Sequence, residues 1–309
     1  MTTDSDDLHS NAIVCAAYGR RVELELPDET TVPARTRRRS LRPVCGDRVV
    51  AVPQPGERDW LINAIEVRSS ELARTDTRGR RELLAANVNT LVVVVAPAPP
   101  TDWFMVDRFL GGAHLAGIDP LLVVNKNDLL DAIPDEVAVY DALGYERYVT
   151  DAHSGEGIAA LAERLAGQTA ALVGQSGVGK SSLTNALVPA ANLAIGALTR
   201  TGDEGRHTTV AARRLRLPRG GALIDSPGVR DYAPHVENLA RVAVAFPEVV
   251  EFAAHCRFAN CHHRREPDCA VRAAVAAGDI DERRYTSYRR LYSITASLQP
   301  RDGPRRKTD

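Results

Sequence analysis

The chain has 309 residues, of which 44% are hydrophobic and 26% are charged, and its formal net charge is −1. This composition is that of a soluble protein of two or three domains, and the near-zero charge excludes binding to nucleic acid through overall charge alone. No apolar run approaches the roughly 20 residues that a membrane-spanning helix needs, and the acidic start "MTTDSDDLHS" lacks the regions of a signal peptide, so we expect a cytoplasmic protein.

Short apolar runs separated by turn residues fill residues 11–67, as in "RVELELPD" and "WLINAIEV". This rhythm predicts a small β-barrel or sandwich. Within it, residues 34–43 hold five arginines in ten positions, which suits either a solvated loop or a contact with nucleic acid. Cys15 and Cys45 lie in apolar, strand-like settings and are expected to be core residues.

The pattern changes from residue 91 onward. The runs "LVVVVAPAP" and "LLVVN" are fully apolar and are separated by a helical stretch, which is typical of parallel strands buried on both faces. The alternation continues through "YERYVT", "GIAALAERL", "AALVG" and "GGALIDSPG". Residues 80–235 therefore predict a βα domain, and helical segments follow it.

The stretch "GQSGVGKSSL" at 174–183 fits the phosphate-loop pattern G-x-x-x-x-G-K-[ST] between a strand and a helix. Inward-pointing amides and the positive end of the helix would hold phosphate there. We expect Lys180 to bridge the β- and γ-phosphates, Ser181 to bind Mg²⁺ and Ser182 to offer an amide to the α-phosphate. The predicted nucleotide contacts of this loop are Gly174, Gln175, Ser176, Gly177, Val178, Gly179, Lys180, Ser181 and Ser182.

Two further motifs complete a guanine-nucleotide site. In "DSPG" at 225–228, Asp225 would hold the metal through water and the Gly228 amide would reach the γ-phosphate. In "NKND" at 125–128, Asp128 can accept two hydrogen bonds that guanine donates and adenine cannot. The motif's other members are Asn125, which braces the loop, Lys126, which packs over the ring, and Asn127, which contributes backbone.

Lysine is rare outside these motifs. Of 39 basic residues only Lys126, Lys180 and Lys307 are lysines, so two of the three lie where a compact ammonium is needed and a planar guanidinium would not serve.

The motif order is unusual because the base-reading motif precedes the phosphate loop. The chain therefore resembles a nucleotide-binding domain cut after the metal aspartate and rejoined through "AGQTAA" at 166–171, a circular permutation that leaves the pocket intact. In this order the segment after Asp225 runs straight into the C-terminal region. Loss of the γ-phosphate is then expected to move that region directly.

A cysteine cluster marks the C-terminal region. Cys256, Cys261 and Cys269 lie within fourteen residues, together with three histidines. Thiolates and an imidazole at this spacing suit a tetrahedral, structural Zn²⁺ ion. Spacing alone leaves the histidine ligand open among His255, His262 and His263.

These motifs together resemble the ribosome-small-subunit-dependent GTPase A family, circularly permuted GTPases of small-subunit maturation. The resemblance also rests on "CGDRV" and "RSSELAR", which it places in the barrel, and on "GRHTT", "DSPGVRDY" and "CRFANCHHRREPDCAV". It implies an α/β fold in which a circularly permuted P-loop GTPase domain carries an N-terminal OB-fold and a C-terminal helical zinc-binding domain. We place these three domains at residues 73–235, 1–72 and 236–309.

The resemblance also assigns residues. It selects Cys256, Cys261, His263 and Cys269 as ligands of one structural zinc ion. The chain departs from the family at "VTDAHSGEG", where Asp151 replaces a serine and Ala152 keeps the amide that would bind guanine O6.

The hydrolytic residues are expected in the loop at 201–209. Val229 occupies the position where Ras-like proteins place a water-orienting glutamine, so another group must position water. Thr208 is the expected contact to Mg²⁺ and the γ-phosphate, with Thr209 as the alternative, and the Mg²⁺ ligands would be Ser181, Thr208 and Asp225. The resemblance implies a catalytic role for His207; an ordinary loop histidine or an RNA contact is the alternative.

We therefore predict a monomeric GTPase, without a membrane partner, that converts GTP to GDP and phosphate. It would bind the small ribosomal subunit and its rRNA in late maturation, and the subunit would stimulate hydrolysis. A nucleotide-gated RNA-binding switch without an obligatory ribosome partner is the alternative, and Asp128 disfavours an ATP-dependent enzyme. The candidate rRNA contacts are residues 34–42 and Arg264, Arg265, Arg283, Arg284, Arg289 and Arg290.

Overall fold

The structure is a computed structural model of the chain. It describes residues 10–19, 21–38, 40–130, 132–191, 193, 212–225 and 232–299.

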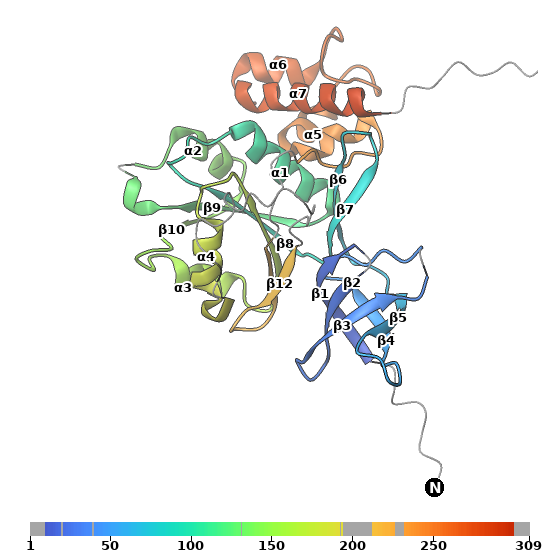
Figure 1. Cartoon of the computed structure of the whole chain (residues 1–309). Helices are drawn as coiled ribbons and strands as arrows, with labels where there is room; N and C mark the ends of the chain where they lie inside the picture. The colour runs from blue at the N-terminus through green and yellow to red at the C-terminus, as the bar shows by residue number, and fades with distance from the viewer. Residues whose placement is uncertain are drawn as a thin grey trace, which may run out of the picture.

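Five strands build an N-terminal barrel (Figure 1). They are β1 (Ser10–Tyr18), β2 (Arg21–Glu25), β3 (Thr31–Thr36), β4 (Arg48–Val52) and β5 (Trp60–Ile65). Their order is β1–β2–β3–β5–β4, and a pairing of β4 with β1 closes the barrel. The predicted small barrel is confirmed, with alternate residues such as Val14, Leu24 and Ile62 filling its interior.

A two-stranded hairpin of β6 (Glu71–Thr75) and β7 (Arg81–Ala86) follows the barrel. "RSSELAR" at 68–74 thus enters this separate sheet, and its expected place in the barrel is wrong. The reason is that β6 finds its backbone partners in β7 and in the segment after residue 231: the Thr75 amide donates to the Ala233 carbonyl at 2.8 Å, and Arg74 forms a bridge with Pro234. The hairpin tip meets the C-terminal helix, because a side chain at Gly79 would collide with the Leu298 carbonyl.

The central sheet has the order β10–β9–β8–β11–β13–β12. All its neighbouring strands are parallel except β12, which runs antiparallel to β13 and also pairs with β1 of the barrel at one residue. The strands are β8 (Thr90–Val95), β9 (Asp119–Asn125), β10 (Glu146–Thr150), β11 (Thr169–Gly174), β12 (Arg213–Arg216) and β13 (Ala222–Asp225). Every residue of β8 is buried, as its continuous apolar run predicts.

Helices cover both faces of this sheet (Figure 1). One apolar cluster joins a face to α1 and α2, and a second joins the opposite face to α3 and α4. These helices are α1 (Trp103–Ala116), α2 (Asp135–Ala142), α3 (Ile158–Arg164) and α4 (Lys180–Leu187), with short 3₁₀ turns η1 (Asn127–Leu129) and η2 (Pro189–Ala191). The predicted α/β domain is confirmed, and β11, which leads into the phosphate loop, lies beside β8 although β9 and β10 separate the two strands in the sequence.

The C-terminal region is helical, as predicted. It contains η4 (Leu239–Ala245), α5 (Pro247–Ala253), α6 (Ala270–Ala277) and α7 (Glu282–Leu298). Before it, Tyr232 is 1% exposed and stacks on Phe109 of α1 at 4.9 Å between ring centroids. The chain from Tyr232 onward is therefore anchored on α1 and β6 before it reaches these helices. The expected movement of the C-terminal region on loss of the γ-phosphate stays a prediction.

A buried ion network joins α7 to α1 and α5. Arg284 is fully buried and donates to Asp107 and Glu248, each at 2.8 Å. Arg283 pairs with Asp107 at 2.9 Å. The expectation that Arg284 contacts rRNA is wrong, because its guanidinium has no access to solvent and its charge is already neutralised.

Across the described part of the chain, no helix combines the length and the apolar content that crossing a bilayer requires.

Candidate functional site

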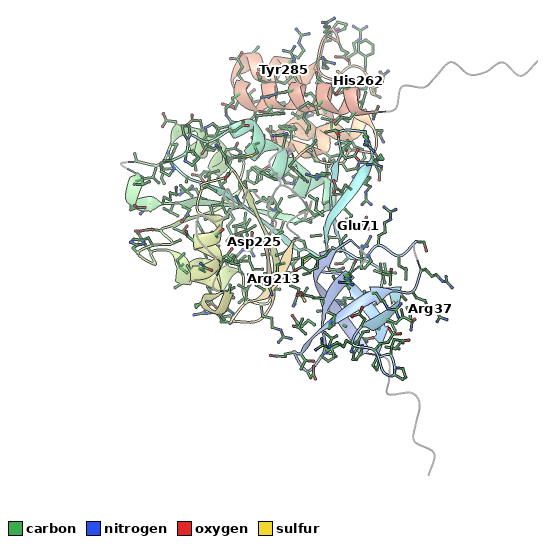
Figure 2. All side chains as sticks on the ribbon, viewed as in Figure 1. Arg37, Glu71, Arg213, Asp225, His262 and Tyr285 are labelled. Carbon is green, nitrogen blue, oxygen red and sulfur yellow. The ribbon has the colours of Figure 1, made fainter. Side chains whose placement is uncertain are left out.

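The carboxyl ends of the parallel strands meet at one edge of the central sheet, where ligands bind in sheets of this type. The predicted motifs lie at this edge although they are far apart in the sequence (Figure 2 labels Asp225). The residues that end these strands are Asn125 of β9, Thr150 of β10, Gly174 of β11 and Asp225 of β13.

The phosphate loop runs from β11 into α4, as its motif predicts. Gly179 precedes the helix with φ +94°, and a side chain there would collide with the Asn125 amide. The Lys180 ammonium donates to the carbonyls of Gly174 and Gln175, each at 2.8 Å, so it lies across the loop that it is expected to serve. Burial raises the pKa of Asp225, and the nearby charge of Lys180 opposes this effect.

Asn125 holds three loops of the site together. Its side chain is buried, and its Nδ2 donates to the Val178 carbonyl of the phosphate loop at 2.9 Å. Its Oδ1 accepts from the Thr150 hydroxyl at 3.1 Å and from the Ala152 amide at 3.3 Å. The residue therefore fixes the base-reading loop against the phosphate loop, a wider role than bracing its own loop.

The rest of the base-reading motif is held by distant partners. Lys126 has φ +63°, and its ammonium donates to the Ala98 carbonyl at 2.7 Å. The Asn127 side chain donates to the Glu156 carboxylate at 3.0 Å, a contact that the sequence does not reveal. Asp128 is exposed, as a carboxylate that reads an incoming base must be.

Asp151 organises the loop that carries Ala152. The Ser154 side chain and the His153 amide donate to the Asp151 carboxylate and lower its pKa. The amide distances are 2.8 Å from His153 and 3.2 Å from Ser154. Asp151 thus closes a tight turn, which leaves the Ala152 amide beside Asn125.

A loop that sequence reasoning missed packs against the phosphate loop. It links β8 to α1, and its Asp102 amide donates to the Gln175 side chain at 3.1 Å. A side chain at Gly177 would approach Pro99 to 3.2 Å. The sequence feature that could have located this loop is Asp102, whose carboxylate caps α1 by accepting a hydrogen bond from the Met105 amide.

Several predicted residues lie outside the described residues. They are His207, Thr208, Thr209, Gly228 and Val229. Their roles stay predictions.

The cysteine cluster forms a compact metal centre. The ligand atoms of Cys256, Cys261, His263 and Cys269 all lie within 4.8 Å of one another. Cys256 Sγ lies 3.9 Å from Cys269 Sγ, and His263 Nδ1 lies 3.4 and 3.6 Å from these two sulfurs. A tetrahedral zinc ion with ordinary bond lengths separates two sulfurs by about 3.8 Å and a sulfur from a nitrogen by about 3.6 Å. The donor set and its spacing therefore fit one Zn²⁺, and His263 is the histidine that joins the group.

Neighbouring polar groups hold the loop of this centre. From α7, the Tyr285 hydroxyl donates to the His263 carbonyl at 2.7 Å and the Tyr288 hydroxyl donates to the His262 carbonyl at 2.8 Å (Figure 2 labels Tyr285 and His262). Burial alone would raise the pKa of Glu266, but backbone amides, first those of Arg264 and Arg265, lower the pKa to about 2. The centre therefore fastens its loop to α7.

Comparison with known proteins supports the same interpretation. The family model described as RsgA GTPase matches residues 65–234. A relative from Alcanivorax borkumensis, named small ribosomal subunit biogenesis GTPase RsgA, is 40% identical over 318 residues, which cover 99% of this chain and 90% of the relative. A relative of the same name from Ectopseudomonas mendocina is 42% identical over 300 residues, covering 94% of this chain and 86% of the relative.

Solved structures share the fold. The crystal structure of YjeQ from Thermotoga maritima has a TM-score of 0.72 and 28% identity, and the match covers 95% of this chain and 100% of that one. The crystal structure of YloQ, described as a circularly permuted GTPase, has a TM-score of 0.71 and 23% identity over 97% of this chain and 100% of that one.

Proposed function

This chain belongs to the RsgA GTPase family and is a GTP hydrolase, and on that premise we propose that it acts on the small ribosomal subunit during late maturation. The names of the relatives carry the ribosomal part of the proposal, and the Asn125 network, which joins the guanine-reading loop to the phosphate loop, supports its nucleotide part. A site with both parts at one sheet edge can hold a whole guanine nucleotide.

The base would be read by the ends of β9 and β10. We assign Asp128 to the two hydrogen-bond donors of guanine and the Ala152 amide to O6. Exposure of Asp128 and the tight turn at Asp151 support this assignment. Adenine offers neither pattern, so GTP is preferred over ATP.

The phosphates would be held by the loop before α4. Lys180 exchanges the carbonyls of Gly174 and Gln175 for phosphate oxygens, while the loop amides and the start of α4 stabilise the negative charge. We assign Ser181, Thr208 and Asp225 to hold Mg²⁺, which when bound neutralises phosphate charge. The Gly228 amide is assigned to the γ-phosphate.

Hydrolysis would depend on His207. Val229 cannot orient water, so we propose that His207 does so when the small subunit is bound. Turnover is then slow in the free protein and faster on the subunit.

Ribosomal RNA would be held by both ends of the molecule. We propose that residues 34–42 and Arg264, Arg265, Arg283, Arg289 and Arg290 contact rRNA, with Arg284 excluded by its burial. Four protein ligands close the zinc site, so its role is structural. We also propose a cytoplasmic monomer with domains at 1–72, 73–235 and 236–309.

The test is the GTPase rate with and without purified small subunits. We expect stimulation by small subunits and none by large subunits. Co-sedimentation with small subunits should need a non-hydrolysable GTP analogue and fail with GDP. Equal rates with and without subunits, or equal use of ATP and GTP, contradict the proposal.

A further inference from the structure

A single strand, β12, connects the barrel to the phosphate edge of the central sheet. In the sheet, Arg213 of β12 pairs with Asp225 of β13 on one side and with Ala16 of β1 on the other. Figure 2 labels Arg213 and Asp225, which face each other across this ladder. Asp225, the residue assigned to Mg²⁺, is therefore separated from the barrel by one strand only.

A carboxylate of the barrel holds β12 in place. Glu25, the last residue of β2, accepts a hydrogen bond from Arg214 at 2.7 Å with one oxygen and from Arg216 at 2.8 Å with the other. Leu24 fills the barrel interior, so the alternation along β2 directs Glu25 outward, toward β12. Arg214 and Arg216 are two positions apart and project from one face of β12. One carboxylate thus fastens two turns of the same strand face.

The pair of Glu25 with Arg214 is largely shielded from water, because both side chains are 11% exposed. Within the described part of the chain, Arg214 has no second carboxylate partner, whereas Arg216 also pairs with Glu29. Removing Glu25 would therefore leave the Arg214 charge uncompensated in a poorly hydrated place, which is costly. An exposed ion pair would contribute little by comparison.

The barrel also packs against β13 directly. Cys45 shares one apolar cluster with Ile224, the residue before Asp225. A side chain at Gly46 would approach Ile224 to 3.3 Å, and the Ala86 amide donates to the Cys45 carbonyl at 3.0 Å. Closely packed interiors transmit displacements, so the position of the barrel is felt at the end of β13.

We infer that Glu25 is a positioning residue for the GTPase reaction, which holds β12 through Arg214 and Arg216 and thereby places Asp225 at the phosphate edge. This role rests on the proposed assignment of Asp225 to Mg²⁺. The base-reading loops follow β9 and β10, at the other end of the central sheet from β12. Glu25 should therefore affect binding of the metal and the phosphates and leave base selection unchanged.

The experiment titrates Mg²⁺ into the full chain with a fluorescent, non-hydrolysable GTP analogue and measures the Mg²⁺ midpoint of analogue binding. Glu25→Ala should raise this midpoint by up to about tenfold, the lower end of the effect of groups that orient metal ligands. Arg214→Ala should also raise it, and the double variant should be no worse than the worse single variant, because both changes remove one contact. Glu57→Ala is the matched control, since Glu57 forms a half-exposed ion pair with Arg35 inside the barrel, and its midpoint should stay unchanged.

Three readouts separate positioning from a general loss of stability. In the nucleotide-free chain, Glu25→Ala should speed amide hydrogen exchange in residues 213–225 and leave exchange in β11 unchanged. The ratio of GDP to ADP affinity at saturating Mg²⁺ should also stay unchanged. Glu25→Gln keeps the shape and an acceptor oxygen, so it should recover part of the midpoint.

An unchanged midpoint in Glu25→Ala overturns the role of Glu25, as do additive effects in the double variant or equal weakening of analogue binding at every Mg²⁺ concentration. Asp225→Asn distinguishes this failure from that of the proposed function. If Asp225→Asn does not raise the midpoint, the metal assignment fails and the role of Glu25 fails with it. If Asp225→Asn raises the midpoint and Glu25→Ala does not, the role of Glu25 fails alone.

Discussion

The base side and the phosphate side of the nucleotide site are prepared to different degrees. On the base side, Asn125 and Lys126 have hydrogen-bond partners in other loops, and Asp151 is bonded within its own turn. On the phosphate side, Lys180 bonds to the carbonyls of its own loop. In the proposed site, the base side is therefore already bonded in the folded chain, whereas phosphate binding would require Lys180 to change partners.

Asn125→Ala should have the largest effect, because it would disconnect the two sides. The change leaves the Val178 carbonyl and the Thr150 hydroxyl without a buried partner. We expect a loss of about 3 kcal/mol or more in GDP binding, over a hundredfold, together with a lower melting temperature. Calorimetric titration and thermal unfolding measure both. Asn127→Ala is the control, and if both variants bind GDP alike, Asn125 does not organise the site.

Lys180→Ala should affect the phosphate side of the site and leave the base side intact. We expect GTP binding to weaken by about 2 to 3 kcal/mol, since a charged hydrogen bond to phosphate is lost. The melting temperature of the nucleotide-free protein should barely change, because the contacts of Lys180 to Gly174 and Gln175 are local. A large drop in stability would show that the lysine is part of the fold and would remove the contrast.

Asp128→Asn should change which base is bound. We expect GTP binding to weaken by about 2 kcal/mol and the preference to shift toward xanthine nucleotides, which present an acceptor where guanine presents a donor. Competition with GDP, xanthosine diphosphate and ADP measures the preference. An unaltered order of the affinities for the three nucleotides would contradict the assignment of Asp128.

Asp151→Ala should have the smallest effect, because it loosens one turn. We expect a several-fold loss of GDP affinity with little change in turnover at saturating GTP, and recovery in Asp151→Asn, which keeps an acceptor. Since the pKa of Asp151 is lowered, its contribution is complete above the ordinary value of about 4 and is lost only as the pH falls through the lower folded value. A GDP affinity of Asp151→Ala equal to that of the unmutated chain would leave the turn without a role.

The sequence predicts the parts of this site better than their connections. Continuous apolar runs and local motifs locate β8, the phosphate loop and the metal ligands, because each pattern is contained in a few neighbouring residues. The bonds from Asn125 to Val178 and from Asp102 to Gln175 join residues 53 and 73 positions apart. Only the folded sheet brings such partners together, so no local pattern reveals them.

The position of charged residues was also predicted incorrectly from the sequence. Arginine-rich segments usually lie at the surface, which made Arg284 an expected RNA contact. Its actual partners, Asp107 and Glu248, lie 177 and 36 positions away. A buried arginine depends on carboxylates from other elements, and composition cannot show them.

The hairpin of β6 and β7 has a consequence for how the molecule unfolds. Arg68 ties its base to the barrel, Thr75 binds Ala233, and its tip at Gly79 meets Leu298 of α7. An element packed on several parts of a chain loses all of its partners at once when it melts, which makes their unfolding cooperative. Calorimetry should therefore show a single main transition in place of a separate melting step for each part of the chain.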